Sequence, residues 1–152
     1  KSDGDGNLRD WWTTEDNNQF NKRAQVVVDQ YNAFVPVDTL HINGELTLGE
    51  NIGDIGGLTV SFNAYKLSLN GNPSTVLNGF TGEQRVFLGW GQVWKTLYRD
   101  EALVERILTD PHSPGEYRVT GVMNNMPEFY EAFDVKEGDG HYLPDEERVK
   151  IW

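Results

Sequence analysis

Two carboxylates stand four residues apart in a segment that is otherwise apolar or small. Glu50 and Asp54 share one face if this segment is a helix, because residues at i and i+4 are neighbours on a helix surface. Like charges at that spacing repel, so a buried pair would need a cation, a metal ion or a partner histidine. A solvated acidic stripe near a helix N-terminus is the alternative that the spacing leaves open.

A histidine and an arginine form the second candidate group. His112 lies between Pro111 and Pro114, and Arg118 follows six residues after the histidine. Held on a rigid loop, these side chains can stabilise a developing oxyanion. A loop histidine that hydrogen-bonds only to the backbone is the simpler interpretation of the same residues.

Known zinc patterns are incomplete within the chain. The chain has three histidines, His41, His112 and His141. No two of them are four residues apart, as the two histidines of a His-Glu-x-x-His helix must be. The absence of cysteine excludes disulfides and thiolate metal sites. The carboxylate pair and the histidine loop therefore resemble half of a site.

A calcium loop is also incomplete. Asp3, Asp5 and Asn7 match the first three ligand positions, but Leu8 stands where the loop needs glycine and Thr14 where it needs glutamate. We expect a plain turn.

Length and charge narrow the classes of protein. The chain has 152 residues, which suits one domain, and its 38% hydrophobic content with 12% aromatic residues favours a folded core. A net charge of −11 without a basic cluster argues against nucleic acid and anionic membranes as partners. No apolar run approaches the roughly 20 residues that span a bilayer.

Helical patterns dominate the first half. A capping residue at Thr13 precedes apolar residues at helical spacing, and Pro36 ends that pattern. Asn43-Gly44 favours a tight hairpin, after which a second helix begins at Thr47 or Gly49 and carries the two carboxylates. Its other stripe is apolar and faces the core.

The second half continues with short helices. Residues 81–84 form a capping box before an apolar run, and a helix is predicted over 100–109. Residues 110–115 cannot be helical, 117–123 are either extended or the start of a helix, and 128–133 follow Pro127 as a short helix. The predicted fold class is mainly α.

These residues carry a resemblance to a known family. The segment Thr47-Leu-Gly-Glu-Asn-Ile-Gly-Asp-Ile-Gly-Gly57 resembles the second zinc motif of the neprilysin family of zinc endopeptidases. Further segments match in the family's order: Gly6-Asn-Leu-Arg-Asp-Trp-Trp12, Leu40-His-Ile-Asn-Gly44, Gln92-Val-Trp94, Asp110-Pro-His-Ser-Pro-Gly-Glu-Tyr-Arg118 and the terminal Trp152. The resemblance spans the whole chain.

The resemblance implies a fold and a place within it. Residues 1–152 would form the C-terminal half of a zincin-type, thermolysin-like catalytic domain. The family's His-Glu-x-x-His helix lies upstream of the segment where this chain begins, at Lys1. The lack of cysteine is more like the bacterial oligopeptidase members, although it does not by itself decide the compartment. For a bacterial parent protein we expect a periplasmic, secreted or envelope-associated location, with the cytoplasm as the alternative.

The resemblance also implies roles for single residues. Glu50 would be the third zinc ligand, and Asp54 would accept a hydrogen bond from a zinc-bound histidine. His112 would stabilise the oxyanion, and Arg118 would hold the substrate backbone. Gly53 replaces the family's usual alanine, from which we expect only a softer helix.

The implied function is peptide hydrolysis by zinc-activated water, with Val93 and Trp94 lining the pocket for a bulky apolar side chain. Without the upstream helix we expect the chain to have no activity and to bind zinc weakly or not at all. Its expected partner is the N-terminal part of the same protein, and alone it should self-associate through exposed apolar surface. The rival interpretation is a non-enzymatic acidic helical module that binds calcium.

Overall fold

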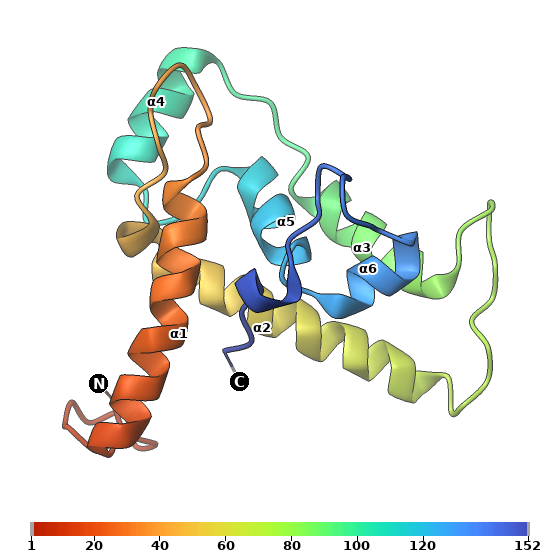
Figure 1. Ribbon diagram of the computed structural model, residues 1–152, viewed down its shortest axis with the longest axis horizontal. Coiled ribbons are helices and arrows are strands. Elements are labelled where there is room, and N and C mark those ends of the chain that lie inside the picture. The colour runs from red at the N-terminus through yellow and green to blue at the C-terminus, as the bar shows by residue number, and fades with distance from the viewer. Residues whose placement is uncertain (1, 152) are drawn as a thin grey trace.

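The computed structural model describes residues 2–151, so Lys1 and Trp152 lie outside the described residues. Within that range the chain forms α-helices and isolated β-bridges without a β-strand, which confirms the mainly α prediction (Figure 1). The helices are α1 (Thr14–Asn32), α2 (Gly44–Ser68), α3 (Gly82–Val93), α4 (Asp100–Thr109), α5 (Gly115–Met123) and α6 (Pro127–Phe133), followed by a 3-10 turn, η1 (Asp145–Glu147).

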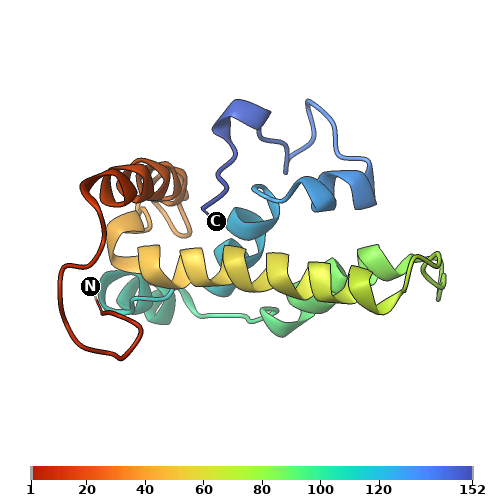
Figure 2. The same ribbon diagram turned by 90° about the horizontal axis from the view of Figure 1, so that it is seen from below.

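Helix α2 is the central element. Figure 2 shows it crossing the molecule, with α1 and the C-terminal segment on one side and α4 on the other. It packs against α1, α3 and α5. Its apolar stripe, with Ile55 and Phe62, is buried, whereas Glu50, Gly53 and Gly57 lie on its exposed side. The helix therefore presents a carboxylate beside small residues on one open face.

Side-chain caps mark the starts of the first three helices, α1, α2 and α3. Thr13 and Asp16 form a reciprocal capping box at α1, and Thr81 and Gln84 form another at α3, as the sequence predicted.

The predicted hairpin at Asn43-Gly44 is wrong, because Asn43 is the N-cap of α2 and its side chain accepts a hydrogen bond from the amide of Leu46. Gly44 is needed for close packing rather than for a turn, since a Cβ atom there would collide with the carbonyl oxygen of Val28 in α1. Helix α2 therefore starts earlier than predicted. Residues 117–123, left open by the sequence, belong to helix α5.

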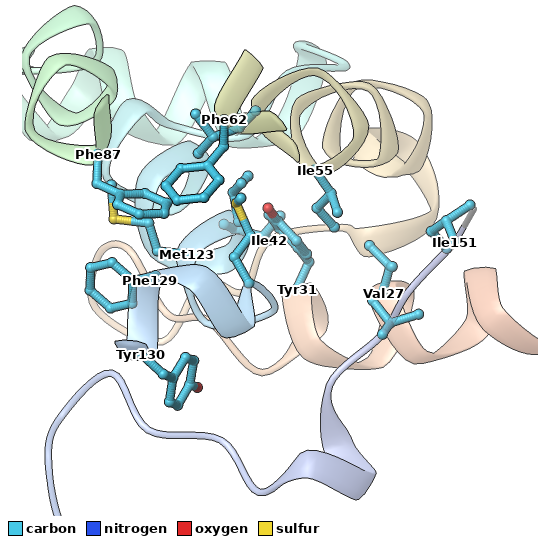
Figure 3. Packing of buried hydrophobic residues seen from close by; sticks show 14 residues of the cluster. Val27, Tyr31, Ile42, Ile55, Phe62, Phe87, Met123, Phe129, Tyr130 and Ile151 are labelled. Atoms are coloured by element: carbon cyan, nitrogen blue, oxygen red, sulfur yellow. The ribbon is translucent and has the colours of Figure 1, made fainter. Parts of the chain in front are cut away.

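Aromatic side chains form much of the core. Phe62 and Phe87 stack with their ring centroids 5.3 Å apart, and Phe129 meets Phe87 edge to face. Tyr31 extends from α1 into the same cluster (Figure 3) and is fully buried. This core joins α1, α2, α3 and α6, so it fixes α2 relative to the later helices. None of the helices in the described range has the length and apolar character needed to cross a membrane.

Candidate active site

Glu50 and His112 meet although they are far apart in the sequence. Glu50 lies in the second turn of α2, and His112 lies in the loop between α4 and α5. The Nε2 atom of His112 is 3.2 Å from Oε2 of Glu50, and its Nδ1 atom is 2.7 Å from Oδ1 of Asp110. Both ring nitrogens face carboxylates, so a ring that donates to both must carry two protons.

Asp110 organises the histidine loop. Its Oδ1 atom also accepts a hydrogen bond from the backbone amide of His112, and its Oδ2 atom forms an ion pair with Arg106 at 2.9 Å. Partial burial raises the pKa of Asp110, but the hydrogen bonds from His112 and the Arg106 charge outweigh it and leave the pKa below its ordinary value. Asp110 is therefore an anion that holds the Nδ1 side of the ring.

Asp54 and Arg118 form a buried bidentate ion pair beside this cluster. The Nε and Nη2 atoms of Arg118 donate to the two carboxylate oxygens of Asp54 at 2.5 and 2.7 Å. Burial lowers the pKa of Arg118, but the hydrogen bonds and charge of Asp54, with the charge of Glu50, raise it above its ordinary value. Arg118 Nη2 also lies 3.6 Å from Glu50, so the guanidinium touches both carboxylates of the predicted pair.

Trp94 covers the guanidinium from the other side. The Cζ atom of Arg118 is 3.9 Å from the centroid of the Trp94 ring, a cation–π contact. A Cβ atom at Gly115 would lie 2.5 Å from the carbonyl oxygen of Trp94, so glycine permits the close approach of the segment after α3 to the start of α5. Val93, the neighbour of Trp94, is exposed. Of the two predicted pocket residues, Trp94 thus contacts Arg118, and Val93 is its exposed neighbour in the sequence.

Glu50 is the residue of the cluster best placed to hold a metal ion. Its side chain is 46% exposed, against 9% for Asp54 and 25% for Asp110. The other two carboxylates are engaged by arginine and histidine at short distances, whereas the contacts of Glu50 are longer. Between residues 2 and 151 there is no group of three side chains that together could hold a metal ion. Glu50 is thus the carboxylate of this cluster that is most open to an incoming metal ion.

The N-terminal acidic residues form a turn. The Oδ1 atom of Asp3 accepts hydrogen bonds from the amides of Asp5 and Asn7, and its Oδ2 atom pairs with Arg9. Its oxygens satisfy the loop itself, in agreement with the expected plain turn.

The structure brings the predicted site residues other than Val93 into one cluster. It also gives Asp54 a partner that the sequence did not reveal. The predicted partner was a zinc-bound histidine, and the observed partner is Arg118. A carboxylate has about four lone-pair sites, so Asp54 retains acceptor capacity and its predicted role stays a prediction. Sequence reasoning also missed Asp110, whose only signal was its position two residues before the histidine.

Three further polar residues were missed because they are buried. Asn51, Ser113 and Thr47 form a hydrogen-bonded chain under the Glu50–His112 contact. The sequence does contain one signal for two of them. Asn51 directly follows Glu50 and Ser113 directly follows His112, so each is a polar residue next to a candidate site residue.

Comparison with known proteins gives a consistent result. The sequence profile of Peptidase family M13 matches residues 1–149. Neprilysin-1 of Caenorhabditis elegans is 44% identical over 142 residues, covering 90% of this chain and 19% of that protein. Human neprilysin is 39% identical over 156 residues, covering 97% of this chain and 20% of that protein.

Solved structures agree in fold. A crystal structure of the Mycobacterium tuberculosis zinc metalloprotease Zmp1 with an inhibitor superposes with a TM-score of 0.96 at 49% identity, covering 99% of this chain and 24% of that one. PepO of Lactobacillus rhamnosis gives a TM-score of 0.80 at 30% identity, covering 97% of this chain and 22% of that one. The chain belongs to Peptidase family M13. It spans about a fifth of the length of the curated relatives it matches.

Proposed function

We propose that this chain is the C-terminal part of the catalytic domain of a zinc endopeptidase that hydrolyses peptides. The observation that carries the proposal is the convergence of Glu50, Asp54, His112 and Arg118, which come from two segments more than fifty residues apart. Membership of Peptidase family M13 supports the reaction class.

Glu50 would hold the metal through its exposed carboxylate. When bound, zinc supplies a Lewis acid that polarises the peptide carbonyl and lowers the pKa of a water molecule. The remaining zinc ligands and the general base would come from a His-Glu-x-x-His helix outside this chain. This division of ligands agrees with the single candidate ligand at the described site.

His112 and Arg118 would act on the substrate. The Nε2–H group of His112 faces the open side of α2 near Glu50 and would donate a hydrogen bond to the carbonyl oxygen as negative charge develops there. Asp110 holds the opposite ring nitrogen, Nδ1, and so fixes the orientation of the ring. With its Nδ1–H donated to Asp110, the ring that also donates from Nε2 is the doubly protonated one. Arg118, fixed by Asp54 and Trp94, would bind a substrate backbone carbonyl with its remaining N–H donors.

Val93 and Trp94 would line the pocket for the substrate's apolar side chain. Val93 is exposed and directly precedes Trp94, whose ring packs on Arg118. A substrate side chain bound at Trp94 would therefore lie beside the residue that holds the substrate backbone. An apolar wall at this position favours bulky apolar residues after the cleaved bond.

The upstream part of the same protein would cover the exposed stripe of α2. Gly49, Gly53 and Gly57 have open space beside them, and Val60 on the same side of the helix is 68% exposed. Alone, the chain would self-associate through such surface. Sedimentation velocity tests this: we expect species larger than the monomer at high concentration, and a single monomeric boundary would contradict it.

The function is tested with a protein that carries this chain together with a His-Glu-x-x-His helix. We expect it to cleave a quenched fluorescent peptide, to lose activity with a zinc chelator and to lose most activity in Glu50→Asp. The isolated chain should cleave nothing. Full activity of Glu50→Asp would remove Glu50 from the metal site.

A calcium-binding module, the rival function, would instead show calcium binding by calorimetry in the isolated chain.

A further inference from the structure

A buried chain of side-chain hydrogen bonds links helix α2 to the histidine loop. Thr47 Oγ1 donates to the carbonyl oxygen of Asn43 at 3.0 Å, Asn51 Nδ2 donates to Thr47 Oγ1 at 2.9 Å, and Ser113 Oγ donates to Asn51 Oδ1 at 2.8 Å. Thr47, Asn51 and Ser113 are 3%, 0% and 1% exposed. Water therefore does not compete for these hydrogen bonds.

The direction of each hydrogen bond in this chain is fixed by the one before it. The single hydroxyl proton of Thr47 is used on the backbone, so its oxygen must act as the acceptor for Asn51. This requirement orients the Asn51 amide with its NH2 group toward Thr47. Its oxygen then faces the loop, where it can accept only from a donor such as the Ser113 hydroxyl.

The buried hydrogen bond runs beside the exposed contact of the candidate site. Asn51 directly follows Glu50, and Ser113 directly follows His112. The Glu50 and His112 side chains are 46% and 38% exposed, and ion pairs in that environment are weak and poorly fixed. The contact between Asn51 and Ser113 is shielded from water and is therefore better able to set the spacing between the two backbones.

We infer that Asn51 is a positioning residue: its hydrogen bond to Ser113, oriented by Thr47, sets the place of the His112 ring relative to Glu50. The catalytic consequence rests on the proposed function, whereas the positioning itself is a property of this chain. Asn51 acts through the loop and does not contact the reacting atoms.

The positioning is tested first by amide hydrogen exchange in the chain itself. In Ser113→Ala we expect the amides of His112 and of residue 113 to exchange about tenfold faster relative to core amides of α1. Thr47→Val should do the same more weakly, because it frees the Asn51 amide to rotate. Thr59→Val is the matched control, since Thr59 makes the same hydrogen bond to the carbonyl four residues earlier, at Ile55, away from the loop.

Unchanged exchange in the loop of both Ser113→Ala and Thr47→Val would overturn the inference, as would an equal effect of Thr59→Val. If Ser113→Ala does not fold, Thr47→Val alone decides between these outcomes.

The consequence for catalysis is tested by a double-mutant cycle in the peptidase that carries this chain. Ser113→Ala should lower kcat about tenfold with little change in KM, because a small misplacement of a catalytic group is costly. In a His112→Ala background the same substitution should lower kcat no further. Equal losses in both backgrounds would show that Ser113 and Asn51 do not act through His112. A wild-type protein without peptidase activity would overturn the proposed function, while the exchange experiment would still decide the positioning.

Discussion

Arg118 binds both carboxylate oxygens of Asp54 across 64 residues of sequence, and the pair is almost closed to solvent. Its guanidinium group contacts three side chains: the Asp54 carboxylate, the Trp94 ring and a carboxylate oxygen of Glu50. This one side chain therefore ties helix α5 to the carboxylate stripe of α2 and to the end of α3.

Breaking the pair should destabilise the chain. Asp54→Asn leaves Arg118 buried with a neutral partner, and we expect a loss of about 3 kcal/mol in the free energy of unfolding. Urea denaturation followed by circular dichroism measures this loss. Asp134→Asn is the control, because the pair between Asp134 and Lys136 is exposed and its loss should leave the midpoint unchanged. Equal midpoints for Asp54→Asn and wild type would contradict the structural role of the pair.

Two glycines should respond to alanine in opposite directions. A Cβ atom at Gly121 would collide with the buried ring and hydroxyl of Tyr31, so Gly121→Ala should cost about 1–3 kcal/mol. A Cβ atom at Gly53 would meet open space, with nothing within 4 Å, and Gly53 lies inside α2. Gly53→Ala should therefore raise the free energy of unfolding by at most about 1 kcal/mol. Thermal unfolding of the two variants provides the comparison; a shift of both melting temperatures in the same direction would rule out this packing.

Tyr31 itself should tolerate loss of its hydroxyl. The hydroxyl oxygen is buried and has no hydrogen-bond partner in the described structure, and burial, followed by the charge of Asp54, raises the pKa of Tyr31 above its ordinary value. Tyr31→Phe should therefore leave the stability equal or higher. A marked drop in the unfolding midpoint of this variant would indicate a partner for the hydroxyl.

Acid should weaken the tie between the end of α2 and the start of α3. Hydrogen bonds from Ser74 and Lys66 lower the pKa of Glu83 from 4.5 to about 2. A carboxyl group whose pKa is lower in the folded state than in the unfolded state stabilises the fold at a pH above its unfolded-state pKa. This stabilisation is lost as the pH falls through the folded-state pKa. Between pH 4.5 and 2, the free energy of unfolding should fall by about 1–2 kcal/mol through Glu83, after allowance for screening of the half-exposed Lys66.

Glu83→Gln tests this contribution. The variant should be less stable than wild type at pH 7 and approach it at pH 2, as judged by urea midpoints across that range. Glu101→Gln, at an exposed glutamate in the first turn of α4, should follow the wild-type curve. A constant gap between Glu83→Gln and wild type at every pH would exclude Glu83 as the titrating group.

His112 should matter for turnover and not for metal binding. In the peptidase that carries this chain, His112→Ala should lower kcat about 100- to 1000-fold, the usual cost of one oxyanion donor, with zinc content unchanged. His41→Ala should remain active, because the exposed His41 ring hydrogen-bonds to the carbonyl of Asn32 at the end of α1 and not to a residue of the candidate site. Zinc lost together with activity in His112→Ala would place His112 on the metal.

The sequence predicted most of the fold and several residues of the candidate site, but not which of these residues contact one another. Capping boxes and apolar spacing are local signals, so the helices that begin after Thr13 and Thr81 were predictable. The dipeptide Asn43-Gly44 has both a turn and a cap interpretation, and only the approach of α1 decides between them. The Arg118–Asp54 pair and the Asn51–Ser113 hydrogen bond join distant segments, and one sequence without tertiary contacts carries no signal for such pairings.

Zinc content is the most direct test of the proposal that Glu50 supplies a ligand to a metal ion shared with an upstream helix. Zinc per protein should be measured after equilibration with zinc and desalting, in the peptidase that carries this chain, in its Glu50→Gln variant and in the isolated chain. We expect close to one zinc per protein in the first, a large loss in the second and none in the third. Undiminished zinc in Glu50→Gln, or stoichiometric zinc in the isolated chain, would contradict it.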